Sequence, residues 1–289
     1  MSKFKRYFTL LFLLSALGLT GCGSGGGGGG GSTASSGGGG LIAITCSVGS
    51  TGSIVGSWNF GSTTGPNNLA VITFFNDGTY MLADDGDPVK DPTGQDGMER
   101  GTYEWSSTTG AFKSTTTVNT DGQWGLSAPE PSNVCMEVIG NKLTFTDSNG
   151  SNTATRIIDV ANSIVGTWYN GDSRASVPDN LGVYTFFDDG TGTGGTYTLE
   201  EDGPSGPSGG GGQDGMERGT YTYNTATKAF TSTCPSVDTN GEWGLSHPIP
   251  GGKCTGEQPA QNATITISGT TATLADNTGP PFTLNRVAP

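Results

Sequence analysis

The chain has 289 residues, of which 13 are basic and 26 acidic, so its formal net charge is −13. A chain this acidic is a poor partner for nucleic acid, because both carry negative charge. The chain has a single histidine, which leaves little scope for a catalytic triad or a histidine-based metal site.

Residues 1–21 have the layout of an export signal. Three basic residues precede an apolar stretch, 7–19, which is shorter than the roughly 20 residues that a membrane-spanning helix needs. The motif Leu-Thr-Gly-Cys that ends at Cys22 resembles the lipobox of bacterial lipoproteins. The resemblance implies that Cys22 is acylated, as by palmitate, and that the lipid bilayer is a partner. An ordinary signal peptide with a chance cysteine is the alternative.

Residues 22–45 are predicted to be the lipidated cysteine followed by a flexible tether. Residues 23–40 contain only Gly, Ser, Thr and Ala, a composition that cannot offset the entropy of ordering. Gly23 stands where lipoproteins kept in the inner membrane typically have Asp, so the resemblance implies an outer-membrane location in the bacterial envelope. Removing the signal takes away three basic residues, which leaves 10 minus 26, or −16.

The remaining chain carries one pattern twice. The offset between copies grows from 110 residues (Ile54 to Ile164) to 119 (Trp124 to Trp243), which fits whole domains and is too long for solenoid repeats. We therefore predict domains at 46–160 and 161–289. The clearest matches are Ile54–Trp58 with Ile164–Trp168, Gln95–Tyr103 with Gln213–Tyr221, and Trp124–Ser127 with Trp243–Ser246.

Each domain is predicted to be all β. Short segments rich in β-branched and aromatic residues alternate with turn residues, and Asp77-Gly78 and Asp189-Gly190 indicate hairpins. About eight antiparallel strands fit a small up-and-down barrel, which removes exposed edges, or a two-sheet sandwich. In the first domain the predicted strands are 53–60, 70–75, a strand beginning at Thr79, 101–105, 111–116, 134–138, 142–146 and 153–158.

Two short motifs carry a family resemblance. Gly56-Ser57-Trp58 and Gly166-Thr167-Trp168 resemble the Gly-x-Trp signature of lipocalin-like (calycin) barrels. Arg156 and Arg286 occupy equivalent places near the end of each domain. The resemblance implies that each arginine stacks on the indole of its domain and closes the barrel floor, with a structural role for all four side chains.

Four cysteines remain after Cys22 is assigned to lipid, and an exported protein favours disulfides. Cys135 and Cys254 each lie 11 residues beyond the second shared Trp of their domain, so they are equivalent. We predict one disulfide per domain, Cys46–Cys135 and Cys234–Cys254. A Cys135–Cys254 pairing would instead require docked domains.

The longest identical segment, Gln-Asp-Gly-Met-Glu-Arg-Gly-Thr-Tyr, is the first place to look for a site. One interpretation is a structural corner, in which Asp-Gly turns the chain, Glu99 and Arg100 face opposite sides of a strand and Tyr103 enters the core. The other interpretation is polar ligand contact at the rim of an apolar cavity. Its candidate residues are Glu99, Arg100 and Trp124 with their counterparts Glu217, Arg218 and Trp243.

Metal binding and catalysis have less support in the sequence. Segments 119–123 and 238–242 alternate oxygen ligands like the start of a calcium loop, but they lack the later bidentate acid, so we expect no metal and no cofactor. His247 corresponds to Ala128 in the first domain, which excludes a shared histidine site. A hydrolase that uses carboxylates such as Asp96 and Glu99 is a weaker alternative to a non-enzymatic protein.

The sequence therefore predicts a membrane-anchored lipoprotein that binds a small apolar or amphipathic ligand in lipocalin-like barrels. The alternative is a structural or adhesive surface lipoprotein whose loops bind proteins or glycans.

Overall fold

The structure is a computed structural model that describes residues 46, 49–65, 67–87, 89, 92–127, 134–147, 150–174, 179–203, 213–233, 236–241, 244–245, 263–275 and 280–287. These residues form strands β1 to β17 and no helix, which confirms the all-β prediction. Accordingly, none of the described residues belongs to a helix that could span a membrane. Cys22 and the segments predicted to be an export signal and a tether lie outside the described residues.

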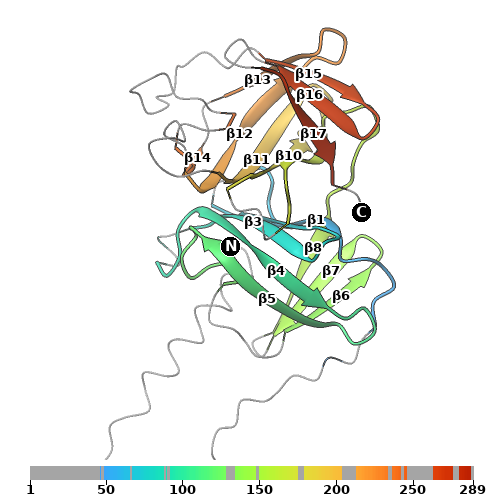
Figure 1. The fold of residues 1–289 in the computed structure, drawn as a ribbon, viewed down its shortest axis with the longest axis vertical. Helices are drawn as coiled ribbons and strands as arrows, with labels where there is room; N and C mark the ends of the chain where they lie inside the picture. The colour runs from blue at the N-terminus through green and yellow to red at the C-terminus, as the bar shows by residue number, and fades with distance from the viewer. Residues whose placement is uncertain are drawn as a thin grey trace, which may run out of the picture.

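The first eight strands close into an antiparallel barrel (Figure 1). Each strand pairs with the next along the chain, and β8 returns to β1 through the pairs Trp58↔Arg156 and Asn59↔Thr155. The strands are β1 (Gly56–Gly61), β2 (Leu69–Phe74), β3 (Thr79–Asp85), β4 (Gly97–Trp105), β5 (Ala111–Asn119), β6 (Val134–Ile139), β7 (Lys142–Asp147) and β8 (Gly150–Arg156).

The second barrel repeats this order with one interrupted strand. Pairing of β17 with β9 and of β11 with β12 closes its ring. Val237 pairs with Arg218 as Val118 pairs with Arg100, so β13 and β14 together correspond to β5. The strands are β9 (Gly166–Gly171), β10 (Leu181–Asp188), β11 (Gly194–Asp202), β12 (Gly215–Tyr223), β13 (Ala229–Ser232), β14 (Val237–Asp238), β15 (Ala263–Ser268), β16 (Thr271–Ala275) and β17 (Phe282–Arg286).

The shared segment that contains Glu99 is strand for most of its length. The sequence pattern placed the start of this strand at Gly101, but β4 begins at Gly97. Asp96 accepts a hydrogen bond from the Gly86 backbone N–H at 2.9 Å, and a side chain at Gly97 would lie 2.5 Å from the Thr120 backbone. Gly97 is therefore required by a close approach of two backbones rather than by a turn.

The floor of each barrel is closed by an arginine over an indole. The guanidinium carbon of Arg156 lies 4.0 Å from the Trp58 ring centroid, and that of Arg286 lies 3.6 Å from Trp168. Each arginine also donates to backbone carbonyls of the segment before the first strand, such as Val55 O at 2.7 Å. A desolvated cation over an indole contributes about 0.5–2 kcal/mol, and these contacts join the last strand to the first.

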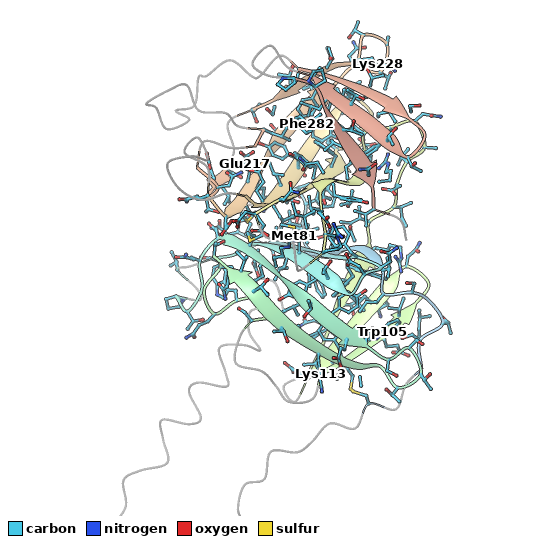
Figure 2. All side chains as sticks on the ribbon, viewed as in Figure 1. Met81, Trp105, Lys113, Glu217, Lys228 and Phe282 are labelled. Carbon is cyan, nitrogen blue, oxygen red and sulfur yellow. A yellow bond between two sulfur atoms is a disulfide. The ribbon has the colours of Figure 1, made fainter. Side chains whose placement is uncertain are left out.

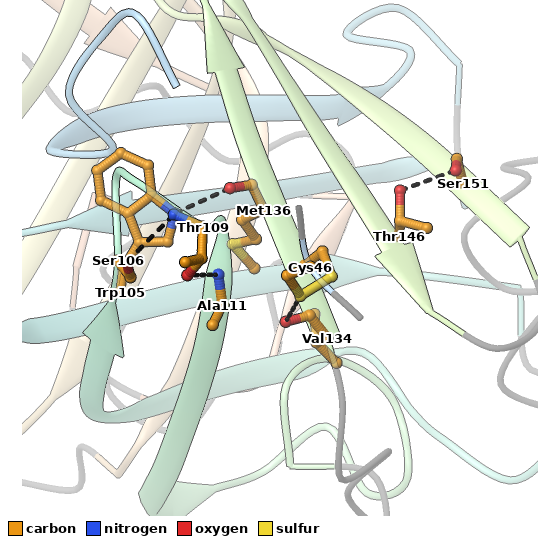
Figure 3. Close-up of a disulfide and its surroundings, with 10 residues drawn as sticks. Cys46, Trp105, Ser106, Thr109, Ala111, Val134, Met136, Thr146 and Ser151 are labelled. Carbon is orange, nitrogen blue, oxygen red and sulfur yellow. Dashed lines mark hydrogen bonds between the residues drawn. A yellow bond between two sulfur atoms is a disulfide. The ribbon is translucent and has the colours of Figure 1, made fainter. Parts of the chain in front are cut away.

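A disulfide joins Cys46 to Cys135 on β6, with the two Cα atoms 5.5 Å apart (Figure 3). It fastens the segment that precedes β1 to β6. Cys234 and Cys254, the predicted second pair, lie outside the described residues.

Large apolar side chains fill the interior of both barrels. Phe74 and Phe112 meet edge to face at 5.8 Å between centroids, and Phe186 and Phe230 repeat that contact at 5.8 Å. Such pairs add about 0.5–1.5 kcal/mol to the gain from burial. The first interior cluster also contains Trp58, Phe60, Ile72, Tyr80, Leu82, Leu126, Met136, Val138, Leu143 and Phe145, all buried.

A third apolar cluster lies between the barrels. On β3, Tyr80 and Leu82 point into the first barrel, whereas Met81 and Ala83 point out toward the second. Figure 2 shows Met81 at this boundary. Both faces of β3 are therefore buried, and the two barrels pack as one unit. The cluster is completed by Phe75, Met98, Leu181, Val183, Met216, Val237 and Val287.

Candidate functional site

Arg100 and Arg218 hold the two barrels together. Arg100 on β4 forms a buried ion pair with Asp202 at the end of β11, and Arg218 on β12 forms the equivalent pair with Asp85 at the end of β3. All four side chains are at most 4% exposed. Since each barrel gives the other the same arginine and receives the same aspartate, the interface has the self-complementary form of a two-fold dimer.

Backbone carbonyls of the opposite barrel complete the arginine contacts. Arg100 Nη2 donates to Asp172 O at 3.0 Å and to Arg174 O at 2.9 Å, and Arg218 Nη2 donates to Gly65 O at 2.6 Å. These acceptors lie in the loop between the first two strands of each barrel. The planar guanidinium has five donors in a fixed arrangement, so it can contact a carboxylate and a loop together. Two of the candidate ligand residues, Arg100 and Arg218, thus make contacts that join the two barrels.

Glu99 points to the other side of β4, into the barrel. Its carboxylate accepts hydrogen bonds from the backbone N–H groups of Leu126 and Ser127, both at 2.8 Å, and from the Tyr80 hydroxyl at 3.3 Å. The side chain is fully buried. Glu99 thus holds the segment Trp124–Ser127, which we call the inward loop, against the barrel core that contains Leu126.

Glycine at the second position of the inward loop allows this contact. Gly125 has φ of +78°, and a Cβ there would lie 2.6 Å from Glu99 Oε1 and 2.5 Å from Leu82. Gly244 in the second barrel also has positive φ, +92°, and packs against Glu217. The repeated Trp-Gly-Leu-Ser motif is therefore explained by the fit of its glycine to the buried glutamate. Trp243 itself lies outside the described residues.

The two barrels differ beside the buried glutamate. In the second barrel, Glu217 accepts from Leu245 N at 3.0 Å and Tyr197 Oη at 3.2 Å, and Asn240 Nδ2 donates to it at 3.3 Å. In the first barrel, Asp121 occupies the place of Asn240. An amide donor in one copy is thus replaced by a second acid in the other.

Asp121 is fully buried, and its carboxylate oxygens have no hydrogen-bond partner among the described residues. Burial, followed by the charges of Glu99 and Asp84, raises the pKa of Asp121 to about 10. Burial also raises the pKa of Glu99. The pair Glu99–Asp121 therefore keeps a proton at neutral pH, because two adjacent buried carboxylates do not both ionise.

A cleft of about 680 Å³ opens where the barrels meet. Polar side chains from both barrels line it, and six of the seven lining residues form three equivalent pairs. The lining residues are Gln95, Asp96, Asn119, Thr120, Gln213, Asp214 and Thr239. The Gln95 and Gln213 amides each donate to a threonine carbonyl, at 2.9 and 2.6 Å. The first residues of the repeated segment thus form the walls of a cleft that a single domain would not have.

No family model, curated protein or solved structure matches this chain significantly.

The remaining candidate residues are buried, stabilise a turn or lie outside the described residues. Trp124 is buried, and a side chain at Gly94 would collide with its indole. In the calcium-like segment 119–123, Asn119 closes its own turn by accepting from Gly122 N at 3.0 Å, so its carboxamide oxygen stabilises a turn. His247 lies outside the described residues.

Sequence reasoning missed Asp85 and Asp202. Both follow Leu-x-Asp/Glu at the end of the third strand of a barrel, so the repeat could have singled them out as shared acids. Their role depends on a partner in the other domain, which no pattern within one copy indicates.

Proposed function

We propose that this chain is a lipid-anchored binding protein that recognises a hydroxyl-rich ligand, a glycan, in the cleft between its two barrels. The observation that supports the proposal most is the polar lining of this cleft by both barrels, while the barrel interiors are filled with aromatic and aliphatic side chains. Ligand sites are concave and contain a few convergent polar groups, and the cleft has that form.

The chemistry of the lining fits sugar hydroxyls. Carboxylates such as Asp96 accept hydrogen bonds, and amides such as Gln95 both donate and accept, so adjacent hydroxyls can be matched in pairs. A cleft built for hydrogen bonding discriminates against apolar ligands, because its polar groups would be left unpaired. Hydrogen bonds to the barrel backbone hold the Gln95 and Gln213 amides in place, which lowers the entropy cost of binding.

The expected ligand of a lipocalin-like barrel, a small apolar molecule, remains the second candidate. It is favoured by the fold itself, since eight-stranded barrels can hold one small ligand. Phe74 and Tyr80 fill the first interior and Phe186 and Tyr197 the second, so an apolar ligand would have to displace these rings.

The test is calorimetric titration of the protein, produced without its signal and Cys22, with a panel of oligosaccharides. We expect binding that Gln95→Ala and Asp96→Asn each weaken about tenfold, which corresponds to about 1.4 kcal/mol. Lys113→Ala is the control, because Lys113 is exposed on β5 away from the second barrel (Figure 2). No binding of any glycan, together with a tryptophan fluorescence response to fatty acids, would favour the apolar ligand.

Anchoring is tested separately in the full-length protein. We expect wild type to partition into detergent and Cys22→Ser to remain in the aqueous phase, because a single residue carries the acyl chains. Equal partitioning of the two forms would contradict the anchor.

A further inference from the structure

Three aspartates of the second barrel meet beside the cleft. One carboxylate oxygen from each of Asp179, Asp202 and Asp214 lies within 4.8 Å of the other two. Asp179 precedes β10, Asp202 ends β11 and Asp214 precedes β12. Asp202 is buried and Asp179 is exposed, so the cluster reaches from the interface to solvent.

Asp202 has an oxygen that the protein does not satisfy. Its Oδ2 pairs with Arg100, whereas its Oδ1 is buried and has no hydrogen-bond partner among the described residues. The side chain is 1% exposed. A buried carboxylate oxygen without a donor is stabilised by a cation or a shared proton, because carboxylates alone repel one another.

We propose that Asp179, Asp202 and Asp214 bind a hard divalent cation, Ca²⁺, at the edge of the cleft. Calcium is coordinated by oxygen atoms at 2.3–2.6 Å, so two of its ligands are separated by at most about 4.6–5.2 Å. The observed limit of 4.8 Å satisfies this condition. An all-oxygen donor set excludes the softer transition metals as preferred ions.

Three carboxylates this close together repel one another. A bound Ca²⁺ would remove this repulsion. One oxygen of Asp214 already accepts from Gly203 N at 3.2 Å, which leaves its other oxygen for the ion.

The first barrel supplies a matched comparison. Asp85 and Asp96 correspond to Asp202 and Asp214, but Asn67 stands in place of Asp179. Asn67 and Asp179 share the same unusual backbone angle, φ of +53° and +55°. Since calcium affinity rises with the number of charged ligands, we infer one calcium site per chain, in the second barrel. This inference does not depend on glycan binding.

The experiment is calorimetric titration of the metal-free protein, produced without its signal and Cys22, with CaCl₂, and MgCl₂ serves as the comparison ion. We expect one Ca²⁺ per chain with a Kd on the order of 10⁻⁴–10⁻³ M, the range of extracellular calcium sites. We also expect an increase in Tm with CaCl₂, because a ligand that binds the folded state stabilises it. Asp179→Asn and Asp214→Asn should each weaken binding at least about tenfold, whereas Glu104→Gln, which removes an exposed carboxylate near the C-terminal end of β4, should bind as wild type does.

The Asp179→Asn variant is the most informative, because Asp179 is exposed and its replacement leaves the Arg100–Asp202 ion pair intact. Circular dichroism verifies that each variant is folded. The proposal is overturned if wild type shows neither heat nor a change in Tm up to roughly 10 mM CaCl₂, ten times the upper Kd. It is equally overturned if Asp179→Asn and Asp214→Asn bind calcium as wild type does.

Discussion

The two barrels share the residues that stabilise the fold, but they differ in the groups that surround their buried acids. Both copies contain an arginine over the floor indole, a glutamate that holds the inward loop and an arginine that reaches into the other barrel. They differ at Asp121 and Asn240, and at Ala83 and Glu200. Residues that are identical in the two copies hold the barrels together, while the residues that differ change the charge and pKa of buried groups.

The largest effect is expected at the interface between the barrels. Arg218→Met should lower the free energy of unfolding by about 3–5 kcal/mol, because Asp85 stays buried without its cation. Arg100→Met should lower the free energy of unfolding by the same amount if the two-fold relation holds. Urea denaturation measures both. The exposed Arg174→Ala, whose ion pair with Asp172 is solvated, should not change stability measurably. Values under about 1 kcal/mol for both buried arginines would contradict the assigned role.

The second largest loss of stability is expected in the inward loop. Gly125→Ala should destabilise the first barrel by about 2–4 kcal/mol, because it combines an unfavourable left-handed backbone with a clash against Glu99 and Leu82. Gly140→Ala is the matched control, since Gly140 has φ of +58° and open space around it. It should show backbone strain alone, about 1–2 kcal/mol. Equal losses in the two variants would mean that the glutamate contact is unimportant.

Exchanging the differing residue beside the glutamate should alter the pH dependence. The pKa of Asp121 is raised from 3.8 to about 10 in the folded protein, so unfolding releases a proton between these values and stability falls as pH rises. Asp121→Asn should therefore stabilise by about 1–3 kcal/mol at pH 8 and have little effect near pH 4.

The reverse change, Asn240→Asp, should destabilise the second barrel at pH 8 for the same reason. Denaturation at several pH values between 4 and 9 measures both variants. An Asp121→Asn effect that does not vary with pH would show that Asp121 does not retain its proton.

The smallest effect is expected at Glu200. This side chain is buried, and burial raises its pKa to about 8. The Thr198 hydroxyl donates to its Oε1 at 3.2 Å, while its Oε2 has no hydrogen-bond partner among the described residues. Since the unfolded glutamate ionises from about pH 4.5, stability falls as pH rises toward 8. Glu200→Gln should thus gain about 1 kcal/mol by pH 8 and almost nothing at pH 4. A constant difference across this range would contradict the raised pKa.

The sequence predicted the strands of each domain and favoured a closed barrel over a two-sheet sandwich, and the pairing of the first and last strands confirms the barrel. Alternating apolar residues with Asp-Gly turns predicted the strands, and the repeat located Trp58, Trp168, Arg156 and Arg286 at equivalent positions. These features are local or lie within one copy, and β pairing depends on such patterns. The equivalence of Cys135 and Cys254 likewise predicted the pairing of Cys46 with Cys135, which the structure contains.

Only the tertiary structure decided what Glu99, Arg100 and Asp202 do. The strand pattern placed Glu99 and Arg100 on opposite faces, but it did not say that one face meets the inward loop and the other a second barrel. Both contacts join residues 27 to 102 positions apart in the chain. The cleft arises from the same docking, whereas the three-aspartate cluster forms where the ends of neighbouring strands of the second barrel meet. The existence of the cleft depends on how two closed surfaces pack, which is set by shape and burial rather than by periodicity along one strand.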